Sequence, residues 1–198
     1  STVQLPTPFG MEEAIKERRG QLAAHQKKRA GLMRLFQQCA AKEISSSQFF
    51  EDLPMYWSSD AGNRLQGKGW ERQGKASNFQ KLASSLIAIV EAPLSDRDDV
   101  VQEQLDGLAR LKIPSRGAFL SEMLCLRFPE RYPVLNEPVW LFLQDVGCTA
   151  QRGAKEGARY IYLARTLRSS LRESPQHPAK NLAELDTVIW LKYRFGRA

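Results

Sequence analysis

The sequence predicts an all-α fold. Three stretches, 11–41, 77–92 and 95–111, carry apolar residues at the three- and four-residue spacing of an amphipathic helix. No alternation of strand-like and helical segments is present, and no segment repeats. Helices packed around a single core are therefore expected, and the whole chain, 1–198, is predicted to form one helical domain.

The N-terminal part, residues 1–56, is expected to supply the first helices. Prolines near the start favour an extended segment before a basic helix over 11–41. Because glycine disfavours helix, Gly20 and Gly31 are expected to divide this helix into two pieces. A serine run, 45–47, is predicted to cap a short helix over 48–53.

Residues 57–76 are predicted to form an irregular basic loop, because they contain four glycines and no periodicity. Basic residues alternate there with Trp57 and Trp70, which suits a loop that lies on a phosphate backbone or stacks on a base. The alternative is a solvated linker whose tryptophans pack back onto the core.

The part from 77 to 198 is expected to hold the functional core. Pro93 is predicted to end the helix over 77–92. Ser95 and Asp98 have the spacing of a capping box at the start of the next helix, which runs to about Leu111.

A tight turn, Lys112 to Gly117, separates that helix from another beginning near Ala118. This order is the outline of a helix-hairpin-helix, in which backbone N–H groups at a helix N-terminus face outward and can bind a phosphate. Lys112 and Arg116 add positive charge beside the turn. An ordinary corner between two helices is the alternative.

The stretch from 108 to 147 resembles the helix-hairpin-helix DNA glycosylase superfamily, whose hairpin reads roughly L-P-G-V-G-x-x-T-A. Pro114, Gly117 and the small Ser121 match this pattern, whereas Ser115 stands at the first glycine and Arg116 at the apolar residue. The segment 134–139 occupies the place of the superfamily's V-D-T-H-V. The segment 181–190 also looks like the terminal helix of glycosylase-like modules in bacterial defence and restriction proteins. The resemblance implies an orthogonal helical bundle.

The resemblance also implies that the catalytic groups are missing. The superfamily's catalytic lysine aligns with Phe119 and its catalytic aspartate with Asn136. Neither side chain can act as the nucleophile or the carboxylate of that chemistry. Asn136 is instead expected to cap a helix that has Pro138 in its first turn. Glu137 is interpreted as a first-turn acid, with a substitute catalytic carboxylate as the alternative.

The stretch from 152 to 172 is predicted to be an amphipathic helix with a basic face that begins with Arg152 and Lys155. A solvated face and a second DNA-contacting surface both fit this pattern.

The composition agrees with a nucleic-acid partner. The net charge is +7, from 29 basic and 22 acidic residues. The cysteines Cys39, Cys125 and Cys148 are widely spaced and lie beside apolar residues, as expected of buried thiols in the cytoplasm. No metal site and no cofactor are expected. The sequence predicts no membrane-spanning segment and no visible signal peptide.

The sequence therefore predicts a non-catalytic domain that binds double-stranded DNA. Sensing of a modified or flipped base for a restriction or anti-phage system is one more specific form that this binding could take. Other subunits or domains of such a system are expected partners. The base pocket is assigned to Asn136 and Trp140. The predicted DNA-binding residues are Lys112, Ser115, Arg116, Gly117, Ala118, Arg64, Lys68, Trp70, Arg72, Lys75, Arg152 and Lys155.

Two other functions remain open at this point. The first is an active glycosylase that uses Glu137, Asp145 or Asp186. The second is a protein-interaction module with an apolar surface at Trp140, Phe142 and Leu143, although core packing is the simpler interpretation of those three residues.

Overall fold

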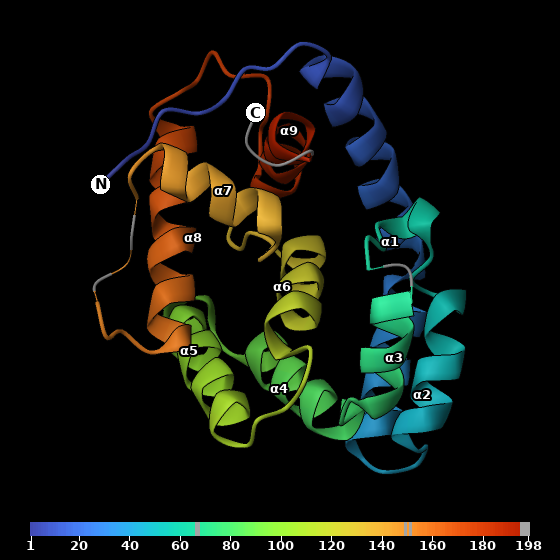
Figure 1. The fold of residues 1–198 in the computed structure, drawn as a ribbon. Helices are drawn as coiled ribbons and strands as arrows, with labels where there is room; N and C mark the ends of the chain where they lie inside the picture. Colours follow the sequence, from blue (N-terminus) through green and yellow to red (C-terminus); the bar gives the residue numbers. More distant parts are fainter. Residues whose placement is uncertain (66–67, 149, 151, 195–198) are drawn as a thin grey trace. The chain divides into compact units, whose positions relative to one another are not determined.

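The computed structural model describes residues 1–65, 68–148, 150 and 152–194. Within these ranges the chain is all-helical and contains no strand, as predicted (Figure 1). None of the helices in these ranges combines the length and the apolar composition that a membrane span requires. The helices are α1 (Met11–Ala40), α2 (Ser46–Asp52), η1 (Leu53–Met55), η2 (Ser59–Ala61), α3 (Lys68–Ala76), α4 (Phe79–Glu91), α5 (Leu94–Arg110), α6 (Arg116–Arg127), α7 (Glu137–Asp145), α8 (Glu156–Arg172) and α9 (Leu182–Tyr193).

The chain divides into two compact units. Unit 1 contains Ser1–Arg19 and Ser121–Ala198, and unit 2 contains Gly20–Leu120. The boundaries fall inside α1 and α6, whereas the sequence pattern placed its divisions at residues 56 and 76.

Helix α1 is continuous over 30 residues, so the expected break at Gly20 and Gly31 was wrong. A glycine in a helix costs about 1 kcal/mol relative to alanine, which packing of the apolar face can offset. Gly31 also has a packing role, because a Cβ there would lie 2.4 Å from Cε1 of Tyr56.

The prediction of an irregular loop over 57–76 was wrong for its second half, which forms α3. Helices α2 and α3 lie side by side in unit 2 (Figure 1). A Cβ on Gly74 would lie 2.2 Å from Cε2 of Phe50 in α2, so this glycine allows the two helices to approach closely. The residue type that indicated a loop is therefore a helix-packing residue here.

Two other predictions about helix starts were corrected. Helix α5 begins at Leu94 with Pro93 as its N-cap and has no side-chain cap hydrogen bond, so Ser95 and Asp98 form no capping box. Ser95 lies inside the first turn, where it cannot serve as the cap. Helix α8 begins at Glu156 rather than near Arg152.

The core of unit 1 is built around α9, which is buried on nearly all sides from Leu182 to Ile189. Helix α7 packs on α9 (Figure 1). The guanidinium of Arg19 donates to both oxygens of Glu184, at 3.0 and 3.2 Å, and so ties the start of α1 to α9. His177 Nε2 lies 2.8 Å from the carbonyl oxygen of Pro6 and holds the N-terminal segment on the same unit.

Candidate nucleic-acid interface

The end of α5 has the geometry of a Schellman cap. The N–H of Ile113 donates to the carbonyl of Leu108, and that of Lys112 to the carbonyl of Ala109, both at 3.0 Å. Lys112 has a φ of 54°, in the left-handed region that glycine usually occupies at this position. The chain therefore reverses sharply at Lys112, whose side chain is exposed.

A second left-handed residue, Ser115, directly precedes α6. Its φ is 64°, and its carbonyl accepts the first helical hydrogen bond, from the N–H of Phe119 at 2.8 Å. Arg116 Nη1 donates to the carbonyl of Ile113 at 3.0 Å and so braces the turn from inside. Gly117 and Ala118 follow in the first turn of α6 and are half-buried.

The C-terminal end of α3 contacts this turn. Ser115 Oγ lies 3.3 Å from Ser77 Oγ and 3.4 Å from Gln73 Oε1. Gln73 stands between the exposed Arg72 and Lys75 on α3. The structure thus brings together two basic segments that are far apart in the sequence, and Arg72, Lys75, Lys112 and Arg116 are called the hairpin surface below.

The tryptophans of the predicted loop belong to an aromatic cluster in unit 2. Trp57 is fully buried, which confirms the alternative prediction that this ring packs on the core. Trp70 is half-buried and stacks on Phe119, with ring centres 6.0 Å apart and planes inclined by 11°. Arg64 is half-buried, and the side chain of Lys68 lies outside the described part of the structure.

Phe119 and Asn136, the positions for which the resemblance implied missing catalytic groups, have structural partners. Phe119 is 0% exposed and contacts Phe36, Trp57, Trp70 and Phe79. Asn136 caps α7, as predicted, because its Oδ1 accepts from the N–H of Val139 at 2.9 Å. Its Nδ2 donates to Asp186 Oδ1 at 3.1 Å.

The alternative catalytic carboxylates lie in different environments. Asp186 is buried on α9, whereas Glu137 and Asp145 are exposed at opposite ends of α7. Glu137 occupies the first turn, where a negative charge stabilises the helix N-terminus.

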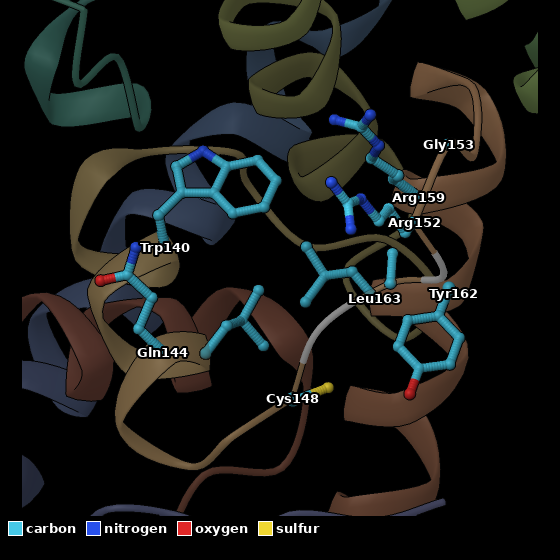
Figure 2. Close-up of a pocket in the computed structure, with 10 residues that line it drawn as sticks. Trp140, Gln144, Cys148, Arg152, Gly153, Arg159, Tyr162 and Leu163 are labelled. Atoms are coloured by element: carbon cyan, nitrogen blue, oxygen red, sulfur yellow. The ribbon is translucent and has the colours of Figure 1, made fainter.

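A cavity of about 310 Å³ lies between α7 and α8 in unit 1 (Figure 2). It is called the α7–α8 pocket below. Its lining residues are Trp140, Leu143, Gln144, Cys148, Ala150, Arg152, Gly153, Arg159, Tyr162 and Leu163. Asn136 does not line it, so the two residues assigned to a base pocket do not share this cavity.

Sequence reasoning missed several members of this pocket. Gln144 follows Trp140 by four residues on α7, and Tyr162 follows Arg159 by three on α8, so each pair lies on one helix face. These spacings were visible in the sequence, but nothing in it indicated that the two faces meet. Of the two predicted DNA contacts nearby, Arg152 lines the pocket and Lys155 is exposed just before α8.

The cysteines differ in their surroundings. Cys39 and Cys125 are buried, and Cys148 is half-buried. Burial raises the pKa of the Cys39 thiol to about 11. Among the described residues, no group of three His, Cys, Asp or Glu side chains could hold a metal ion.

No family model, no curated protein and no solved structure matches this chain.

Proposed function

We propose that this protein binds double-stranded DNA through the hairpin surface and carries out no reaction on it. The observation that carries the proposal is the contact between Ser115 and the end of α3, which places the basic residues of α3 beside the turn between α5 and α6. A turn with a helix N-terminus and several cations suits a phosphate backbone.

The backbone of the turn supports the likeness to a helix-hairpin-helix. Ser115 stands where the superfamily pattern has its first glycine and still has the left-handed conformation that glycine favours. The serine at this position therefore has a φ that a glycine would adopt without strain.

The non-catalytic part of the proposal rests on Phe119 and Asn136. A phenylalanine packed among aromatic rings offers no nucleophile, and an amide whose two ends are engaged offers no general base. We extend the proposal to a role in targeting for a restriction or anti-phage system, and this extension rests on the resemblance of the segment 181–190 alone.

The test measures the binding of a fluorescent duplex by anisotropy, at salt concentrations between about 50 and 200 mM. The Lys75→Ala/Lys112→Ala variant removes two exposed cations of the hairpin surface. The slope of log K against log salt is expected to become shallower by about 2, since each phosphate contact contributes about 0.9. Lys27→Ala/Lys28→Ala removes the same charge from the exposed side of α1 and is the matched control.

Equal loss of affinity in both variants would show that only net charge matters and would contradict a hairpin site. No shift of the wild-type protein at the lowest salt would remove the DNA-binding proposal altogether. Duplexes with modified cytosine or adenine extend the same measurement, and a preference for one of them would identify a base sensor. An assay for released base is expected to show no product.

A further inference from the structure

The α7–α8 pocket combines aromatic and cationic side chains in a way that the hairpin surface does not. We infer that it binds one aromatic anion of nucleotide size, either a free nucleoside monophosphate or one nucleotide of a strand. The inference does not rest on DNA binding by the hairpin surface, because every residue that lines the pocket belongs to unit 1.

Two large rings at the pocket remain in contact with solvent. Trp140 is 46% exposed and Tyr162 is 39% exposed, although other apolar residues of the same helices, such as Val139 and Ile161, are buried. Figure 2 shows the Trp140 indole on one side of the pocket and the Tyr162 ring on the other. Exposed aromatic rings beside a cavity offer a surface on which a planar base can stack.

The charged groups that line the pocket are both cations. Arg159 Nε donates to the carbonyl of Ala154 at 2.9 Å, which orients the guanidinium. Within the described ranges, the terminal nitrogens of Arg159 and the guanidinium of Arg152 have no hydrogen-bond or ion-pair partner. Figure 2 shows the two guanidinium groups on the same side of the pocket. Paired guanidinium groups favour a phosphate, which accepts several hydrogen bonds at once.

The volume of the pocket and its remaining lining residues restrict the choice of ligand. A volume of about 310 Å³ is at the lower end of the range of small-molecule sites, about 300 to 1,000 Å³, and suits one nucleotide rather than two. Leu143 and Leu163 provide apolar contact. The exposed amide of Gln144, on the turn after Trp140, can donate to and accept from the edge of a base.

Cys148 supplies a direct measurement of occupancy, because its half-buried thiol lines the pocket whereas Cys39 and Cys125 are buried. The rate of alkylation of the folded protein by iodoacetamide is followed by mass spectrometry. The probes are deoxyadenosine monophosphate, deoxycytidine monophosphate, deoxyadenosine, inorganic phosphate and a single-stranded decamer. Cys148→Ser identifies the signal, and isothermal titration gives an independent affinity.

A nucleoside monophosphate or the decamer is expected to slow alkylation of Cys148 at least fivefold at saturation. Protection by the monophosphates alone identifies a free nucleotide as the ligand, and protection by the decamer alone identifies a nucleotide in a strand. Trp140→Ala and Arg159→Ala are each expected to weaken binding at least tenfold. Lys16→Ala, an exposed cation elsewhere in unit 1, is expected to leave the affinity unchanged.

Absence of protection and of binding heat with every probe would overturn the inference. So would unchanged affinity in the Trp140→Ala and Arg159→Ala variants, or equal protection by deoxyadenosine, which lacks the anionic group. The Lys75→Ala/Lys112→Ala variant separates the two proposals, because it is expected to bind the duplex more weakly, with the shallower salt dependence given above, and to keep its affinity for the mononucleotide.

Discussion

Asn136 Nδ2 donates to Asp186 Oδ1 across 3.1 Å, while Asn136 Oδ1 accepts from the N–H of Val139. One amide therefore caps α7 and also gives a hydrogen bond to a buried carboxylate on α9. A carboxylate at position 136 could keep the cap and would lose the donor.

Asn136→Asp is expected to destabilise the protein at pH 7 by about 1–3 kcal/mol, because it places a second carboxylate against Asp186. This loss of stability is expected to become smaller as the pH falls toward 4. One carboxyl of the pair then takes up a proton and can donate a hydrogen bond to the other. Urea unfolding at both pH values measures this. The Asn136→Asp/Asp186→Asn double variant restores one donor and one acceptor and serves as the control. If it is no more stable than Asn136→Asp, the hydrogen bond is not the cause.

Phe119→Lys is expected to cost more than about 3 kcal/mol of folding stability. The substitution removes a buried ring from contact with Trp70 and buries an ammonium group. Phe119→Leu keeps the site apolar and is expected to cost about 1 kcal/mol. Thermal unfolding followed by circular dichroism compares the two, and similar melting temperatures would mean that the lysine escapes the cluster.

Gly74→Ala is expected to destabilise the protein by about 1–3 kcal/mol, because the added Cβ would overlap the Phe50 ring at 2.2 Å. Gly20→Ala is the matched substitution at an exposed position, where the Cβ meets nothing within 4 Å. Only the higher helix propensity of alanine then matters, so Gly20→Ala is expected to raise the free energy of unfolding by about 0.5–1 kcal/mol. Chemical denaturation of both variants should give opposite signs, and a gain at Gly74 would contradict the close approach of α2 and α3.

Ser115→Gly is expected to raise stability by about 0.5–1 kcal/mol, because glycine adopts a φ of 64° without the steric cost that serine bears. The hydroxyl contacts that it removes are long, at 3.3 and 3.4 Å. Ser115→Ala loses the same contacts and keeps the strain, so it should be the less stable of the two. Equal unfolding midpoints would indicate that this residue is not left-handed in solution.

We expect the protein to lose stability at alkaline pH because of the buried Cys39 thiol. Its pKa rises from an ordinary 9.0 to about 11 because burial disfavours the thiolate. Between these values the unfolded chain releases a proton that the folded chain retains, so the free energy of unfolding falls as the pH rises. The slope from this group is at most about 1.4 kcal/mol per pH unit. Cys39→Ala should have a shallower pH dependence over that range, and an unchanged dependence would exclude the thiol as the source.

Local sequence signals predicted those helix ends that depend only on neighbouring residues. Pro93 separates α4 from α5, and Asn136 with Pro138 starts α7, because proline and a capping amide act on the backbone within one turn. The reversal after Leu111 was also visible, although the residues that make it, Lys112 and Ser115, are left-handed without being glycine.

The features that the sequence did not reveal depend on residues distant along the chain. The sequence indicates a loop at Gly74, because it does not show that the Phe50 ring occupies the space where a side chain would lie. The end of α3 and the hairpin, two basic segments far apart in the sequence, come into contact because Ser77 and Ser115 meet. Trp140 and Tyr162 line one cavity because α7 and α8 lie on either side of it. Helix type and helix ends follow from periodicity and local hydrogen bonding, whereas a surface or a pocket requires the close packing of side chains that no local pattern encodes.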